Sequence, residues 1–132
     1  MYKLILKVKS AIEQIEREKG SFKIKSLVAK NADNIQWDLV LSAEWFDDKN
    51  QLERMDYLAK KILSGFDFEN MMQFSGIVTF AFNESNPFIN LLNKIQDDNF
   101  HGKYPDCGGY SLVEPHEENI KWIIPLNGPL PH

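Results

Sequence analysis

The spacing of apolar residues near the N-terminus predicts an amphipathic helix. Apolar side chains recur at intervals of three and four residues between Leu4 and Ile15, which places them on one face of a helix over residues 2–19. Gly20 follows at the position where a left-handed residue commonly ends a helix. The alternation within residues 4–8 also fits a strand, but a strand leaves the continuation of the pattern to Ile15 unexplained.

Two further helices are predicted where capping residues precede an apolar stripe. The first follows the polar segment 47–50 and ends at Gly65. Its expected buried stripe consists of Leu52, Met55, Ala59, Ile62 and Leu63. The second has Asn86 as its cap and Pro87 in its first turn, and it ends near Asp98. The expected stripe of this helix consists of Phe88, Leu91, Leu92 and Ile95.

Two β-prone segments between the first and second helices predict a hairpin. The strands are Phe22–Lys30 and Ile35–Glu44, and the polar segment Asn31–Asn34 has the composition of a turn. In the second strand, Trp37 and every second residue after it are mostly apolar. Asp38 and every second residue after it are a mixture of polar and apolar residues. We therefore expect helices to cover the first face and water to reach part of the other.

Three more strands are predicted in the second half of the chain. The run Gly76–Phe82 is apolar on both faces, which is typical of a central strand, and it follows a stretch over Phe66–Phe74 that looks irregular. The segments Tyr110–Glu114 and Ile120–Leu126 predict a second hairpin around the turn Pro115–Asn119.

The order of these elements predicts an α+β fold, α-β-β-α-β-α-β-β. Strand-helix-strand connections over residues 35–82 and 76–113 favour parallel neighbours, and the two hairpins add antiparallel ones. We expect a mixed sheet of about five strands with three helices packed on it. Residues 1–132 then form a single domain, of which 127–132 is a loose tail.

The composition supports one core and no membrane span. A chain of 132 residues, 43% of them apolar, is long enough to bury a core without disulfides or a structural metal. No apolar run approaches the roughly 20 residues that a spanning helix needs, and Lys7 and Lys9 interrupt the only candidate for a signal-peptide core. The single cysteine, Cys107, fits a reducing compartment. The expected location is the cytoplasm.

The charge is distributed unevenly along the chain. Residues 1–30 have eight basic and three acidic residues, a net charge of +5. Residues 31–132 have seven basic and sixteen acidic residues, a net charge of −9. An acidic surface repels nucleic acid and attracts basic proteins. The basic N-terminal residues that could touch RNA are better explained as a solvated helix face and strand edge; they are Lys3, Lys7, Lys9, Lys23 and Lys25.

The segment after the second predicted strand is the main candidate for a binding surface. Trp45 and Phe46 stand between Glu44 and the pair Asp47 and Asp48, and aromatic side chains rimmed by charge are typical of binding hot spots. The alternatives are that the aromatic residues belong to the core, and that an aspartate caps the following helix. Carboxylates in this position could also bind a metal or transfer protons.

Two further acidic pairs extend this candidate surface. They are Asp97 with Asp98 and Glu117 with Glu118. Such pairs also occur in loops simply because they are well solvated.

One cluster has the residue types of a nucleophilic site. Cys107 lies between His101 and His116 in the sequence, and a histidine close in space would lower the pKa of the thiol. The spacing matches no thiol enzyme, and a closed zinc site needs four ligands. No phosphate-binding loop, nucleophile elbow or paired-histidine helix occurs, so neither a metal nor another cofactor is expected.

Together these observations favour a protein-binding module. We expect an immunity or inhibitor protein that neutralises a basic toxin or nuclease by direct binding, because the chain is small, acidic and without a catalytic set. The alternatives are a small enzyme that uses Cys107 with His101 or His116, and a subunit of a larger assembly. The sequence leaves the oligomeric state open.

Overall fold

The computed structural model describes residues 2–29, 36–48, 50–100, 111–112 and 122–127, and it has the expected α+β class. The elements are α1 (Tyr2–Lys19), β1 (Phe22–Ala29), β2 (Trp37–Ala43), the 3-10 turn η1 (Glu44–Asp48), α2 (Gln51–Leu63), α3 (Phe68–Gln73), β3 (Phe74–Phe80), α4 (Pro87–Phe100), β4 (Ser111–Leu112) and β5 (Trp122–Pro125).

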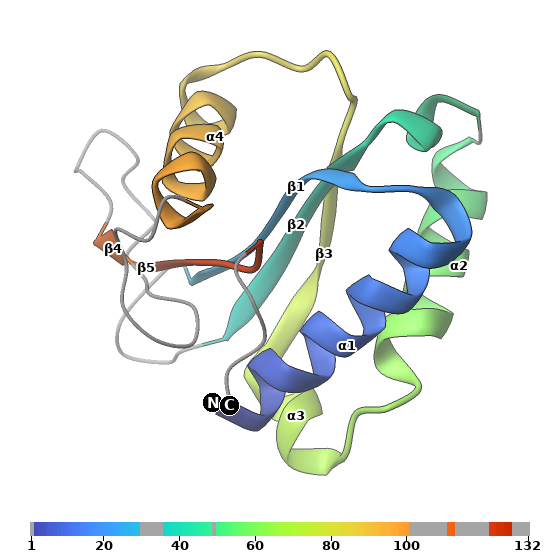
Figure 1. The fold of residues 1–132 in the computed structure, drawn as a ribbon. Helices are drawn as coiled ribbons and strands as arrows, with labels where there is room; N and C mark the ends of the chain where they lie inside the picture. The colour runs from blue at the N-terminus through green and yellow to red at the C-terminus, as the bar shows by residue number, and fades with distance from the viewer. Residues whose placement is uncertain (1, 30–35, 49, 101–110, 113–121, 128–132) are drawn as a thin grey trace.

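The strands of this part of the chain form one mixed sheet in the order β3-β2-β1-β5-β4. Both predicted hairpins are confirmed, because β1 pairs antiparallel with β2 and β4 with β5. The parallel pairing of β2 with β3 across α2 is also confirmed. Two expectations are wrong: β3 lies at an edge instead of the centre, and β4 lies at the opposite edge instead of beside β3. The reason is that α4 crosses the sheet before the chain returns to it (Figure 1).

Helices cover both faces of the sheet. The larger core cluster joins α1 and α2 to one face, and a second cluster joins α4 to the other through Ile89, Leu92 and Ile95. The face of β2 that was expected to be partly wet is therefore dry around Val40 and Ser42, which are 2% and 1% exposed. The sequence of β2 could not show this, because the covering helix follows more than forty residues later.

Helix α1 has the predicted bounds and the predicted buried face. Leu4, Val8 and Ile15 are completely buried, so the strand interpretation of residues 4–8 is wrong. Gly20 has a φ of 108° and donates its amide hydrogen to the carbonyl of Glu16 at 3.0 Å, as a left-handed residue at the end of a helix does.

Helix α2 begins and ends close to the predicted positions, and of its predicted stripe Ile62 is buried and Leu63 packs against the core, whereas Leu52 does not. The side chain of Asn50 caps it by accepting from the Glu53 amide at 2.8 Å, so neither Asp47 nor Asp48 is the cap. Leu52, predicted to be buried, is 80% exposed, and the buried residues are Leu58 and Ile62. At 3.6 residues per turn, Leu52 lies about 100° around the helix from the direction of those two residues.

The stretch expected to be irregular contains the short helix α3. Asp67 and Asn70 form a capping box in which each side chain accepts from the backbone amide of the other, at 2.8 and 3.1 Å. The apolar side chains of α3 do not form an inward stripe; Phe68, Met71 and Met72 are 81%, 47% and 60% exposed. Periodicity therefore gave no signal for this helix.

Helix α4 has the predicted start. The side chain of Asn86 accepts from the Ile89 amide at 2.9 Å, and Pro87 occupies the first turn. The helix continues to Phe100, two residues beyond the predicted end. Among the helices described, none is long and apolar enough to cross a bilayer.

Candidate functional site

The turn η1 connects β2 to α2 and separates its aromatic side chains from its acidic ones. Trp45 and Phe46 are 9% and 0% exposed, whereas Glu44, Asp47 and Asp48 are exposed. The turn departs from strand alternation, and consequently two successive side chains both enter the core. Of the two interpretations of Trp45 and Phe46, the core interpretation is confirmed.

An aromatic cluster holds this turn against the rest of the protein. The rings of Trp45 and Phe46 meet edge to face with centroids 4.7 Å apart, and Tyr57 of α2 lies 5.7 Å from Trp45. Phe22 of β1 completes the cluster at 6.0 Å from Phe46. Contacts from β1 and α2 thus fix the backbone that presents the carboxylates.

Arg54 makes a second attachment between α2 and the turn. Its Nη1 donates to the carbonyl of Phe46 at 3.1 Å, and its guanidinium carbon lies 4.9 Å from the centroid of the Phe46 ring. The arginine closest in sequence to the acidic residues therefore serves to hold the turn.

The first turn of α2 adds an exposed apolar side chain within a few residues of these carboxylates in the sequence. Leu52 is 80% exposed, and its neighbour Glu53 is also exposed and accepts from the side-chain amide of Asn50 at 3.2 Å. We define the acidic turn surface as Glu44, Asp47, Asp48, Leu52 and Glu53. Lys49, within the same segment, lies outside the described residues.

The acidic turn surface lies at the carboxyl end of the parallel strands. Since β2 and β3 run in the same direction, the loop after β3 reaches the same end of the sheet, where Ser42 Oγ donates to the Ala81 carbonyl at 3.2 Å. That loop adds the exposed Glu84. Lys23 also lies there, and its Nζ donates to the Phe82 carbonyl at 2.9 Å.

The remaining predicted site residues are not brought to this surface. Asp97 and Asp98 lie on the last turn of α4, across the sheet from the core cluster that contains η1. The other predicted residues are outside the described part of the chain; these are Glu117, Glu118, His101, Cys107 and His116. Within the part that is described, no three His, Cys, Asp or Glu side chains are grouped as metal ligands.

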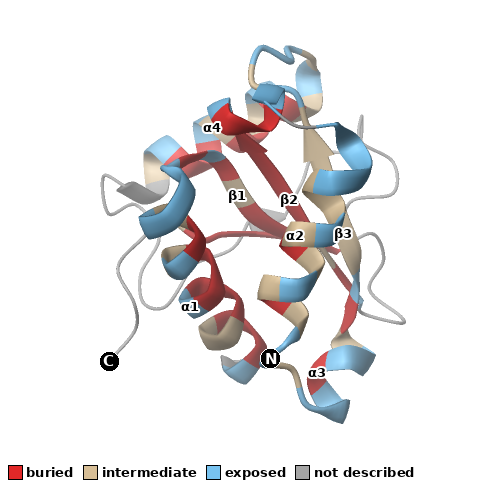
Figure 2. Ribbon diagram, turned by 90° about the vertical axis from the view of Figure 1, so that its right-hand side faces the viewer, coloured by how far each residue is buried: buried red, intermediate tan, exposed pale blue. Residues whose placement is uncertain are grey.

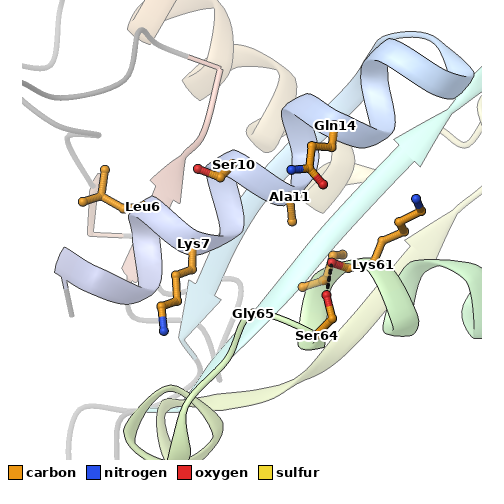
Figure 3. A pocket seen from close by; sticks show the side chains of 9 residues that line it. Leu6, Lys7, Ser10, Ala11, Gln14, Lys61, Ser64 and Gly65 are labelled. Carbon is orange, nitrogen blue, oxygen red and sulfur yellow. Dashed lines mark hydrogen bonds between the residues drawn. The ribbon is translucent and has the colours of Figure 1, made fainter.

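A shallow groove of about 270 Å³ runs between α1 and α2 (Figure 3). Its walls are Leu6, Lys7, Ser10, Ala11, Gln14, Lys61, Ile62, Ser64 and Gly65. Both lysines are already paired, Lys7 with Asp67 at 3.5 Å and Lys61 with Glu18 at 3.0 Å. Their side chains extend toward opposite ends of the groove, so their charges do not converge on a common point.

The residues with shifted pKa values link helices to one another. Burial, and then a 2.6 Å hydrogen bond from Tyr57 Oη to Glu18, raise the pKa of Tyr57 to about 12. The same hydrogen bond, with a second from Lys61, lowers the pKa of Glu18. The backbone amide of Asn70 and then the charge of Lys7 lower the pKa of Asp67. These groups connect α1 with α2 and α3, and they perform a structural role.

Comparison with known proteins identifies no relative. The chain matches no protein-family model, no curated protein and no solved structure. Its function is therefore argued from the acidic turn surface and the fold that presents it.

Proposed function

We propose that this chain is a protein-binding module that captures a basic partner through the acidic turn surface. The observation that carries the proposal is the exposed side chain of Leu52, in a segment of the chain that also has the exposed carboxylates of Asp47, Asp48 and Glu53. An apolar side chain that a partner can desolvate, rimmed by charges that select the partner, has the composition of a binding hot spot.

The rigidity of η1 favours this use. Trp45 and Phe46 are buried in the aromatic cluster, and Arg54 binds the backbone of the turn from α2. A surface that is already ordered loses less conformational entropy on binding than a flexible loop. The carboxylates therefore present a fixed pattern to a partner.

The charge of the chain favours a basic partner. Residues 31–132 have a net charge of −9, and they include every carboxylate of the acidic turn surface. Opposite charge accelerates the encounter and suppresses acidic competitors. Enzymes that cut nucleic acids have cationic active surfaces because their substrates are polyanions. We therefore propose the role of an immunity or inhibitor protein that covers such a surface on a toxin or nuclease.

The test is a binding experiment with site-directed variants. The full chain is used to isolate a partner from its source cells, and the dissociation constant is then measured with the purified partner. We expect Leu52→Ala to weaken binding about tenfold to thirtyfold, as loss of a central apolar contact does. The double reversal Asp47→Lys with Asp48→Lys should weaken it further, mainly through slower association.

A matched control separates a specific surface from general electrostatics. Glu13→Lys with Glu69→Lys produces the same change in net charge on α1 and α3, away from η1. We expect this control to bind within about threefold of the unmodified chain. Equal weakening by both double variants, or an unchanged affinity in Leu52→Ala, would contradict the proposed surface.

A further inference from the structure

The edge strand β3 lacks the features that usually protect a sheet edge. In the described part of the chain it pairs only with β2, and it presents seven residues, Phe74–Phe80, with neither a charge nor a proline. Natural edge strands are commonly shortened or carry lysine, proline or a covering segment, because an open row of backbone groups recruits another strand. At the other edge, the structure describes two residues of β4, Ser111–Leu112.

Nothing in the described part of the chain requires a glycine at position 76. Its backbone is not in the left-handed region, and a Cβ added to it would meet no atom within 4 Å. The neighbouring irregularity does not require it either, because the unpaired residue between Phe74 and Gly76 is Ser75. Glycine weakens a strand interior, and it often marks a position that another chain approaches closely.

The regular part of β3 is complementary to itself. An antiparallel pair of Gly76–Phe80 segments centred on Val78 places Gly76 of one copy opposite Phe80 of the other. An aromatic ring covering a glycine across two strands is a known stabilising pair. The same register pairs Ile77 with Thr79 and Val78 with Val78, and β-branched side chains pack well in such positions.

Several exposed or half-buried apolar side chains lie on β3 and on the helix that precedes it. Val78 is 37% exposed, and Phe80 is half-buried against Phe88, with ring centroids 6.1 Å apart. Helix α3 leads directly into β3 and has Phe68 and Met72 on its surface. In Figure 2, β1 and β2 are largely buried, whereas β3 beyond its first residue is intermediate or exposed and α3 is mostly exposed.

We propose that two copies of this chain pair antiparallel through β3, centred on Val78, to form one continuous sheet. In this arrangement, α3 of each copy lies beside the segment that follows β3 in the other copy. That segment covers the apolar side chains of α3. A second copy fits this edge better than a basic partner does, because the strand has no charge to recognise one. The pairing uses a surface separate from the acidic turn surface, so either proposal can fail without the other.

The test is the molar mass in solution of the full chain and of charge variants at Val78. Sedimentation and light scattering should give twice the 15.3 kDa of one chain. Val78→Lys places two lysines directly opposite each other, and Val78→Glu two glutamates. Each variant alone should raise the dissociation constant of the dimer about tenfold or more. An equimolar mixture of the two should restore the dimer, because the introduced lysine faces the introduced glutamate only in the proposed register.

The controls keep folding separate from pairing. Leu52→Lys introduces the same charge at an exposed apolar position on α2 and should remain dimeric. Circular dichroism should show all variants folded. Independently of any variant, the backbone amides of Gly76–Phe80 should become more protected from hydrogen exchange as the concentration of the unmodified chain rises. A monomer at the highest soluble concentration, a charge variant that alone dimerises as tightly as the unmodified chain, or a mixture that dimerises no more tightly than either variant alone overturns the proposal.

Discussion

Gln96 connects α4 to the edge of β1 at the point where β5 ends. Its side-chain oxygen accepts from the Lys25 amide at 2.7 Å and from the hydroxyl of Ser26 at 3.2 Å, and its side-chain nitrogen donates to the Lys23 carbonyl at 2.9 Å. Pairing of β1 with β5 begins at Ser26. The side chain of Gln96 therefore supplies hydrogen-bond partners for the β1 backbone at the positions before Ser26, where β5 does not pair with it.

We expect Gln96→Leu to lower the free energy of unfolding by about 3 kcal/mol. Leucine fits a side chain that is 7% exposed, but it leaves the Lys25 amide and the Lys23 carbonyl without their partner. Buried polar groups without a partner cost about 1–3 kcal/mol each. Urea denaturation measures the change, and Asn90→Leu, exposed on the same helix, should change stability by less than about 0.5 kcal/mol. Equal stability of the two variants would show that the hydrogen bonds of Gln96 are dispensable.

At the scale of elements, a polar cluster joins the end of α1 to α2. Glu18 accepts from Tyr57 Oη at 2.6 Å and from Lys61 Nζ at 3.0 Å. The ammonium groups of Lys19 and Lys61 also lie over the Tyr57 ring, 5.3 and 5.8 Å from its centroid. Near the other end of α1, Lys7 pairs with Asp67, the cap of α3, at 3.5 Å, so α1 is tied to both α2 and α3.

The raised pKa of Tyr57 predicts a loss of stability at alkaline pH. The neutral phenol is favoured in the folded chain, so its contribution is fully present below the ordinary pKa of 10.0 and is lost as the pH rises to about 12. In an ultraviolet titration, one of the four tyrosines should ionise later than the others. That late step should be absent in Tyr57→Phe, whose stability should also fall less steeply over this pH range. Identical titration curves would contradict the assignment.

At the scale of the whole molecule, the two proposed interfaces differ in their electrostatics. The acidic turn surface combines four carboxylates with one apolar side chain, whereas β3 has no charged residue. Each copy of the chain has a net charge of −4, so two copies repel each other weakly and a basic partner attracts either of them.

Salt should therefore change the two associations in opposite directions. Raising the ionic strength from about 0.05 M to about 0.5 M shortens the Debye length from about 14 Å to about 4 Å. We expect the dimer of the chain to become about twofold to fivefold tighter, and its complex with a basic partner to become at least about tenfold weaker. Sedimentation and binding titrations over the same salt series measure both. A dimer that weakens as salt rises would indicate an interface other than the uncharged strand.

The sequence alone predicted the local structure wherever a helix had its own apolar periodicity or its own capping residues. Helix α1 was predictable because its stripe continues over about three turns, and the start of α4 was predictable from Asn86 and Pro87. Helix α3 was not, since a six-residue helix held by a capping box has too few turns to show a period. The stripe of α2 was misjudged because Leu52 is apolar but faces water.

The candidate site depended more on tertiary structure. The acidic character of residues 44–53 was visible in the sequence, but the burial of Trp45 and Phe46 follows from Phe22 and Tyr57, which come from distant segments. The exposure of Leu52 and the buried hydrogen bonds of Gln96 gave no local pattern to detect.

What the sequence determined by itself was the set of elements apart from α3 and η1, the α+β class and the acidic balance, because periodicity, capping residues and charge are properties of neighbouring residues. Tertiary structure alone decided which strand lies at the edge and which face of β2 is dry, because both depend on where α4 crosses the sheet. Within the described part of the chain, the open edge of β3 is a consequence of that crossing. A run of seven uncharged residues fits a central strand equally well, and only the path of the remaining chain places it at the edge.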